Sequence, residues 1–124
     1  MPAPEALRGT RVVAGEAALD ALLGAIPTSA TGLRFAPDEA LILGTTGIAL
    51  DDPDAIVEDE AGFVAVTVDR AVVEHHTEWT LPAPGAVAQG SIAGVPCKLA
   101  WSPDGQAWVV THAAYLDELL DRLG

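Results

Sequence analysis

Apolar residues recur at helical spacing in two stretches of the chain, residues 16–26 and 113–123. The two apolar stripes are Leu19, Leu22, Leu23 and Ile26, and Leu116, Leu119, Leu120 and Leu123. One such stripe per segment is typical of a helix that buries one face. Gly15 is a suitable N-cap for the first helix, and Pro27 ends it because proline disfavours the helical conformation in the residue before it. A third helix is predicted over residues 70–79, with Asp69 as its N-cap.

Short β-branched or apolar runs between turn residues predict strands. The expected strands are 33–35, 40–43, 63–68, 91–101 and 106–111. Residues 102–105, Ser-Pro-Asp-Gly, suit a tight turn. Proline presets φ at the second position of the turn, and glycine readily adopts the left-handed backbone conformation that closes it. An antiparallel hairpin is therefore expected there. Gly94 and Pro96 should disturb its first strand, which would leave regular pairing only near the turn.

These elements predict an α+β fold. Helices should pack on one face of a mostly antiparallel sheet, with a ferredoxin-like arrangement in the second half of the chain. The length of 124 residues suits one domain. We assign residues 11–124 to that domain and residues 1–10, which carry Pro2 and Pro4 and show no periodicity, to a loose N-terminal tail.

The chain is strongly acidic. Eighteen Asp and Glu oppose six Lys and Arg, which gives a formal net charge of −12. Such a surface repels nucleic acid and anionic membranes. It maintains solubility, or it steers the protein toward a basic partner. Most of the acidic block 51–60 is predicted to lie on an exposed loop, with Ile56 and Val57 holding its middle. It lacks the residue order of a calcium loop.

Cysteine content and the distribution of apolar residues indicate a cytoplasmic protein. Cys97 is the only cysteine, so no disulfide can form within the chain, and it is expected to be a small buried residue. Residues 1–8 contain no apolar run of the kind that a signal peptide needs. No apolar stretch approaches the roughly 20 residues that a membrane span requires.

Three histidines are the residues best suited to chemistry. His75 and His76 with Glu78 suggest a metal, but neighbouring helix residues point about 100° apart, so we favour surface or packing roles. His112, at the end of a predicted strand, could bind a ligand or simply hydrogen-bond a loop. There is no Gly-x-Ser-x-Gly motif and no phosphate-binding loop. No catalytic residue, metal or cofactor is therefore predicted.

Three segments carry a resemblance to a known family. Residues 33–44, Leu-Arg-Phe-Ala-Pro-Asp-Glu-Ala-Leu-Ile-Leu-Gly, resemble the apolar-Gly-Pro-Asp-Glu-Trp-Leu-Leu-Leu segment of the gamma subunit of heterotetrameric sarcosine oxidase. Residues 88–96 are similar to the family's Gly-x-x-Ala-x-Thr segment and the strand after it. Residues 108–116 resemble its closing strand and the start of its last helix. Ala36 and Ala40 replace a glycine and a tryptophan of the pattern, and residues 66–70 depart from the family's Asp-x-Ser-His/Arg stretch.

The resemblance spans residues 33–123 and implies an aminomethyltransferase-like fold. It also implies a non-catalytic role, because the gamma subunit holds no flavin or folate and packs against larger subunits that do. We therefore expect an accessory or interaction domain with a larger flavin- or folate-binding protein as its partner.

Two alternatives remain open. The first is a small-molecule binding domain or weak enzyme, with folate or an amine as ligand and Gln89, His112 and Tyr115 as its site. The second is a homo-oligomer that associates through Trp79 or Trp101 on an exposed apolar patch.

Overall fold

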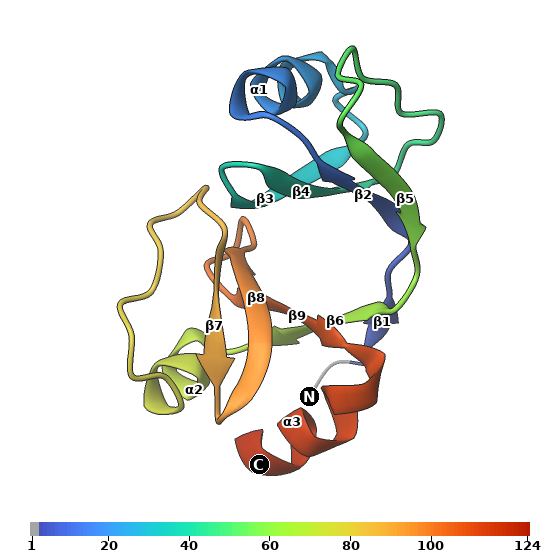
Figure 1. The fold of residues 1–124 in the computed structure, drawn as a ribbon. Coiled ribbons are helices and arrows are strands. Elements are labelled where there is room, and N and C mark those ends of the chain that lie inside the picture. Colours follow the sequence, from blue (N-terminus) through green and yellow to red (C-terminus); the bar gives the residue numbers. More distant parts are fainter. Residues whose placement is uncertain (1–2) are drawn as a thin grey trace. The chain divides into compact units, whose positions relative to one another are not determined.

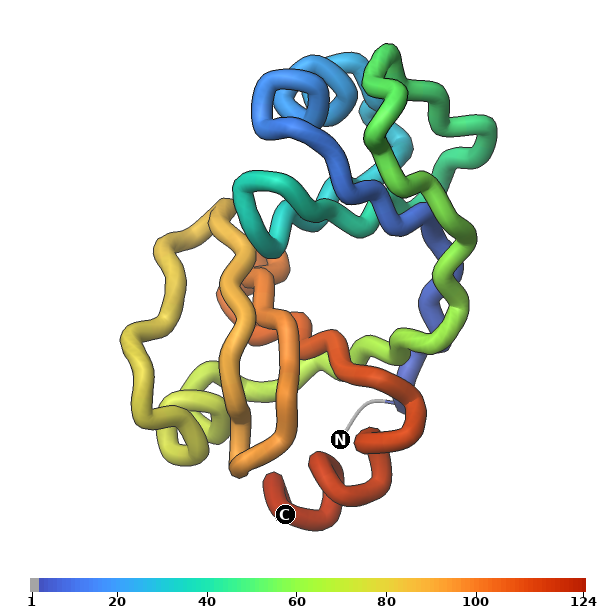
Figure 2. The backbone as a smooth tube through the Cα atoms, viewed as in Figure 1, coloured from blue at the N-terminus to red at the C-terminus, as the bar shows by residue number. Residues whose placement is uncertain are grey.

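The computed structural model describes residues 3–124 and contains two antiparallel sheets and three α-helices (Figure 1). The chain divides into two compact units. Unit 1 comprises the chain up to Ala6 together with Gly62–Gly124, and unit 2 comprises Leu7–Ala61. The chain thus leaves unit 1 after its first strand and returns at Gly62, a path that can be followed in Figure 2. No helix within residues 3–124 is long and apolar enough to cross a membrane.

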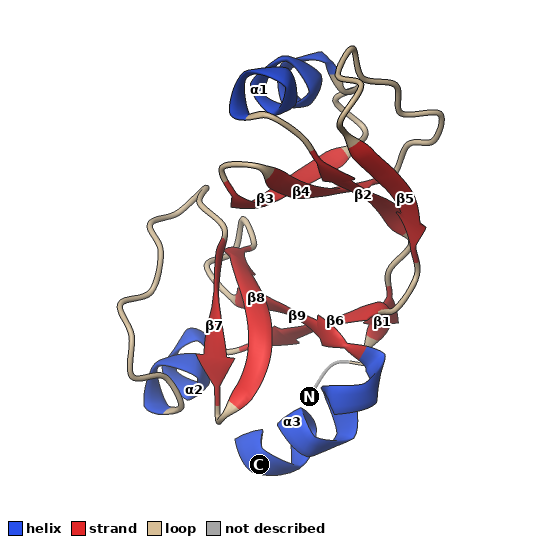
Figure 3. Ribbon diagram, viewed as in Figure 1, coloured by secondary structure: helices blue, strands red, loops and turns tan. Residues whose placement is uncertain are grey.

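Unit 1 contains a five-stranded sheet in the order β1-β6-β9-β8-β7. Its strands are β1 (Glu5–Ala6), β6 (Phe63–Val68), β7 (Ala88–Ile92), β8 (Val95–Trp101) and β9 (Ala107–His112). The helices are α2 (Arg70–His75) and α3 (Leu116–Leu123), and a 3₁₀ turn, η1 (Ala113–Tyr115), leads into α3. Figure 3 shows the long loop between α2 and β7.

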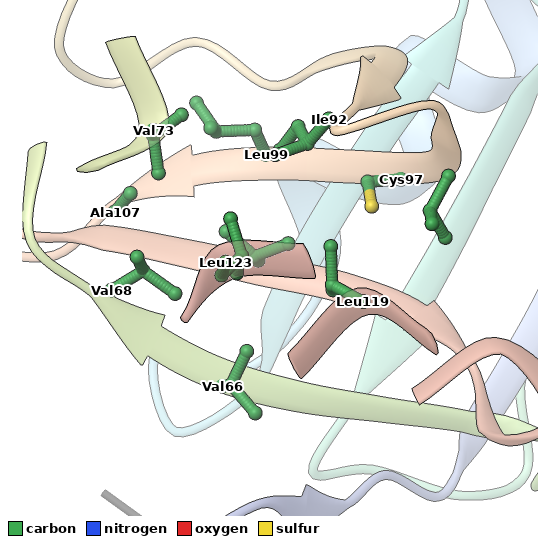
Figure 4. Packing of buried hydrophobic residues seen from close by; sticks show 11 residues of the cluster. Val66, Val68, Val73, Ile92, Cys97, Leu99, Ala107, Leu119 and Leu123 are labelled. Atoms are coloured by element: carbon green, nitrogen blue, oxygen red, sulfur yellow. The ribbon is translucent and has the colours of Figure 1, made fainter. Parts of the chain in front are cut away.

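The core of unit 1 lies between one face of this sheet and the two helices. Val66 and Val68 of β6, Cys97 and Leu99 of β8, and Val109 of β9 point toward it, as strand alternation requires. Leu119 and Leu123 of α3 and Val73 of α2 belong to the same cluster (Figure 4). The helices therefore cover one face of the sheet. The strand residues that alternate with these core positions line the other face.

Unit 2 contains a four-stranded sheet in the order β3-β4-β2-β5. Its strands are β2 (Gly9–Val13), β3 (Thr31–Ala36), β4 (Glu39–Leu43) and β5 (Ile56–Glu60). The helix α1 (Glu16–Ala25) packs its apolar stripe on Val12, Ala40 and Ile42. Gly15 stands at the N-cap as expected, and its backbone N–H donates to a carboxylate oxygen of Asp52 at 3.1 Å.

The α+β class and the antiparallel pairing are confirmed, although the strands form two sheets where one was expected. The predicted turn is present: Gly105 has a φ of +83° and donates its N–H to the carbonyl of Ser102 at 2.9 Å. β8 and β9 pair from Lys98–Val110 to Trp101–Ala107, so regular pairing is confined to the turn end.

Three local predictions need correction. Glu5–Ala6 pair with β6, and residues 9 and 10 belong to β2, so the expected loose tail is wrong for these positions; residues 1 and 2 lie outside the described part. The acidic block is not all loop, because residues 56–60 form β5. The helix from residue 70 ends at His75 rather than at residue 79. The assignment of residues 11–124 to one domain stays a prediction, because a compact unit is not a demonstrated domain.

Candidate functional site

A pocket of about 330 Å³ opens on the helix-free face of the unit 1 sheet. Most of its side chains come from strand positions whose alternation points them away from the core, although buried Cys97 and Thr111 also contribute to the lining. Gln89 of β7 lies opposite Lys98 of β8, and Lys98 lies opposite Val110 of β9. Phe63 of β6 lies opposite His112 of β9. The antiparallel register therefore gathers residues that are far apart in the sequence onto one patch.

An aromatic pair forms one wall of this pocket. The rings of Phe63 and His112 are stacked, with centroids 4.5 Å apart and planes inclined by 26°. The ammonium of Lys98 lies 4.9 Å from the centroid of the Phe63 ring, within the range of a cation–π contact. Phe63 itself is buried, whereas His112 is exposed, so the imidazole is the accessible part of the stack.

The structure brings together two of the three predicted site residues. Gln89 and His112 both line the pocket, together with Ser91 and Lys98. Tyr115 is not among the lining residues; its ring meets His112 edge-on, with centroids 6.1 Å apart. Whether any of the three binds a ligand stays a prediction.

Sequence reasoning missed Phe63 and Lys98. Both were missed because the two-residue turn between β7 and β8 was not recognised. In this turn Ala93 and Gly94 have φ values of 50° and 78°. A recognised turn at this position would have set Gln89 opposite Lys98. Glycine at the second position was the available signal, but the alanine before it is unusual in a turn with two positive φ values.

Cys97 belongs to the core rather than to a reactive site. Burial raises the pKa of its thiol to about 11, and the smaller opposing effects of Thr111, Ile92 and Lys98 do not offset it. At neutral pH the thiol therefore stays protonated and weakly nucleophilic. The prediction of a small buried residue is confirmed.

The histidine pair lies where α2 ends. The rings of His75 and His76 meet edge-on with centroids 5.0 Å apart, and the backbone carbonyl of His76 accepts a hydrogen bond from Ala93 at 2.9 Å. Within residues 3–124, no group of three His, Cys, Asp or Glu side chains lies close enough to hold a metal ion. The geometry of the pair thus suits packing against the β7–β8 turn.

The two tryptophans expected on an exposed apolar patch are half-buried. The indole N–H of Trp79 donates to the carbonyl of Ser91 at 2.8 Å, and that of Trp101 donates to the carbonyl of Pro82 at 2.7 Å. Both rings pack against the unit 1 core. They therefore provide no such patch, and self-association itself stays untested.

Comparison with known proteins shows a likeness in structure and none in sequence family. No family model matches the chain, and no curated protein matches it. The fold is similar to that of a chain in the heterotetrameric sarcosine oxidase from Corynebacterium sp. U-96 in complex with pyrrole 2-carboxylate, with a TM-score of 0.75 and 16% identity. The match covers 97% of this chain and 79% of the other. The TM-score establishes the shared α+β fold, and at this identity the likeness extends to the fold alone.

Proposed function

We propose that this chain is a non-catalytic accessory subunit that binds a larger flavin- or folate-binding protein. The observation that carries the proposal is the fold likeness over 97% of the chain to a component of a heterotetrameric enzyme. The sequence resemblance of residues 33–123 to a gamma subunit supports the same role. The net charge of −12 adds a means of steering toward a basic partner surface.

The edge strand β5 is the surface best suited to that partner. Within the described residues β5 pairs only with β2, so it is an edge strand of the unit 2 sheet, the kind of strand at which a further strand can be added. Ile56 and Val57 are 49% and 43% exposed and point to opposite faces of the sheet. A strand added here would contact apolar side chains on both faces while hydrogen-bonding the edge.

The charge of β5 specifies which strand it accepts. Glu58 and Asp59 are exposed beside the apolar pair. Such charges protect a free edge against indiscriminate pairing. They also favour an extended segment that carries Lys or Arg, so we assign β5 to a basic segment of the larger protein.

The test is copurification from the cells that make the protein. The tagged chain is purified at low salt, passed through size exclusion, and analysed by mass spectrometry and flavin absorbance. The proposal expects one larger flavin- or folate-binding protein at fixed stoichiometry, released at high salt because ions screen the attraction. Elution of the chain alone at low salt contradicts it.

Two variants locate the surface. Ile56→Thr with Val57→Thr keeps β-branched side chains but removes apolar area, and it should abolish the complex. Tyr115→Ser is the matched control, since Tyr115 is the remaining exposed large hydrophobic residue in the described part, and it should leave the complex intact. Equal recovery of the partner with both variants would refute the assignment to β5.

The pocket supports a second candidate function, the binding of a small molecule such as a folate or an amine, or weak catalysis on it. The supporting observation is that Gln89 and His112, separated in sequence, line one pocket. A ligand at a hundred times its dissociation constant should stabilise the fold by about 2.7 kcal/mol. A thermal-shift screen of the isolated chain with folates and amines measures this effect, and no shift with either class contradicts the candidate.

A further inference from the structure

Among residues 3–124, β7 is the one edge strand that carries no charged residue. The strand orders place β1, β3, β5 and β7 at the edges of the two sheets. Glu5 belongs to β1, Arg34 to β3 and Glu58 to β5, whereas β7 reads Ala-Gln-Gly-Ser-Ile over residues 88–92. Charged side chains on an edge strand discourage pairing with another chain. The residues of β7 therefore give its outer edge no protection of this kind.

The backbone of Ser91 faces that outer edge. Ser91 lies opposite Pro96 of β8, and proline has no N–H to donate to it. The two residues therefore form a non-hydrogen-bonded pair, in which the N–H and C=O groups point away from the partner strand. By the same alternation the backbone groups of Gln89 face outward as well. The positions at which a further strand would bind β7 are thus Gln89 and Ser91.

The segment that follows α2, residues 76–79, bonds to the end of this edge, and we call it the cap. The indole N–H of Trp79 donates to the outward carbonyl of Ser91 at 2.8 Å. Two residues further along, the N–H of Ala93 donates to the carbonyl of His76 at 2.9 Å. The cap therefore takes the place at this end of β7 that a neighbouring strand would take.

The cap also covers the strand and adds a charge beside it. The ring of Trp79 lies against the middle of β7, where a Cβ atom added at Gly90 would be 2.7 Å from it. The exposed Glu78 lines a hollow of about 460 Å³ together with Ser91, so a carboxylate lies near the end of the edge. A strand that approached β7 here would have to displace the indole and face this negative charge.

We propose that residues 76–79 keep the edge of β7 from pairing, and that β7 without this cap pairs antiparallel with β7 of a second copy of the chain. The net charge of −12 makes two copies repel each other, and an uncharged edge is where that repulsion is least. An uncharged strand offers no attraction to a basic or an acidic segment, whereas two identical strands can pair about a two-fold axis. Trp79 thus opposes self-association, and the inference does not depend on partner binding at β5.

Trp79→Ala tests the cap, because it removes both the indole N–H and the ring over Gly90. Light scattering of the whole chain compares the molar mass of variant and parent at concentrations up to roughly 1 mM. The mass of the variant should rise with concentration to about twice that of the parent, as for a two-fold dimer, while the mass of the parent stays constant. Trp79→Leu keeps an apolar side chain against the core but donates no hydrogen bond, and it should behave in the same way.

Trp101→Ala is the matched control for the loss of an indole. Trp101 also packs against the unit 1 core and donates its N–H to a backbone carbonyl, that of Pro82, but this carbonyl belongs to a loop. The variant loses a comparable side chain without uncovering β7, so its mass should equal that of the parent. A rise in mass caused by destabilisation alone would appear in this variant too.

A second substitution locates the contact at β7. Ser91→Glu places a carboxylate on the edge strand of each copy, and like charges on paired strands repel. In the Trp79→Ala background it should restore the mass of the parent. Ala114→Glu adds the same charge at an exposed position of η1, away from β7, and should leave the dimer intact.

Hydrogen exchange of the parent measures the cap without any variant. The indole N–H of Trp79 and the amide N–H of Ala93 should each exchange at least roughly tenfold more slowly than the same group in an unfolded peptide, because both are hydrogen-bonded. Exchange at the unfolded rate would refute the cap whatever the variants do.

Two results from light scattering would overturn the inference. A folded Trp79→Ala or Trp79→Leu variant with the mass of the parent up to roughly 1 mM would show that the uncapped edge does not pair. A parent that is already a dimer and is dissociated by Ser91→Glu would show that the cap does not keep β7 from pairing. Neither result bears on the accessory-subunit proposal, which copurification decides.

Discussion

The contact between Trp79 and Gly90 gives the sharpest test of the unit 1 fold. Trp79 lies in the loop after α2, and its indole covers β7 at Gly90. A Cβ atom added at Gly90 would lie 2.7 Å from Cε2 and 2.9 Å from Nε1 of the indole. Both distances are shorter than van der Waals contact, so Gly90→Ala must displace the ring.

The ring cannot move without cost. Its N–H donates to the carbonyl of Ser91 at 2.8 Å, and its apolar face packs on the unit 1 core. A lost hydrogen bond of this kind costs about 1 kcal/mol, and overpacking costs about 1–3 kcal/mol. Replacing glycine lowers the entropy of the unfolded chain, which returns about 0.4–1 kcal/mol. We therefore expect Gly90→Ala to lower the free energy of unfolding by about 1–3.5 kcal/mol.

Gly24→Ala is the matched control, because Gly24 is exposed in α1 and a Cβ there meets no atom within 4 Å. The same substitution should stabilise the protein by up to about 1 kcal/mol, because alanine favours a helix. Thermal and urea unfolding of both variants measures the two effects. At this chain length, where 1 kcal/mol corresponds to about 4 °C, Gly90→Ala should lower Tm by about 4–13 °C. A Gly90→Ala variant as stable as the parent would refute the placement of Trp79.

Three further predictions concern the β7–β8 turn, the buried thiol and the charged face of unit 2. Ala93→Gly should raise stability in urea by about 0.5–1 kcal/mol, because alanine is strained at a φ of 50°; a loss would show that the turn is not as described. The folded-state pKa of Cys97 is raised above that of the unfolded chain. The stability that the protonated thiol contributes is therefore full below pH 9 and is lost as pH rises toward 11. That loss should reach at most about 3 kcal/mol, and Cys97→Ala should remove this part of the slope; an unchanged slope contradicts it. Arg11 forms ion pairs with Glu39 and Glu58, at 3.3 and 2.8 Å, so Arg11→Met should cost up to about 1 kcal/mol at low salt and less at 1 M salt. A cost that does not depend on salt would rule out the ionic origin.

The elements predicted correctly are those whose signals are local. The Leu19 stripe with Pro27 behind it defines α1, and the Ser102–Gly105 turn sets the β8–β9 hairpin. The helix α3 was predicted for the same reason, because Leu119 and Leu123 recur on one face. In each case a few neighbouring residues carry both the periodicity and the boundary, so no long-range pairing has to be known.

The acidic strand β5 could not be recognised from its own residues. Repulsion among Glu58, Asp59 and Glu60 argues for a loop when they are considered alone. In the sheet, Arg11 lies directly opposite Glu58 and forms an ion pair with it, so a cation 47 positions away offsets part of the repulsion. The strand around Arg11 was itself missed, because residues 9–13 fell within or next to the assumed tail.

The candidate site was predicted in part for a related reason. His112 and Gln89 stand out as polar residues on strands, and they do share a pocket. Lys98 was considered only as a neighbour of Cys97, and Phe63 only as part of a strand. Their role depends on the register of three strand pairs, which no single segment of sequence specifies.

The contact between Trp79 and Gly90 also bears on where α2 ends. Residues 76–79 continue the helical pattern but are not helical; instead, Trp79 packs on Gly90 and the carbonyl of His76 accepts from Ala93. If that packing sets the helix end, the effects of Trp79→Phe and Gly90→Ala must depend on each other. The smaller phenyl ring should accommodate the added methyl group, so the double variant should lose at least 0.5 kcal/mol less than the sum of the single variants. Strict additivity in a double-mutant cycle would mean that the residues do not touch, and the boundary of α2 would need another cause.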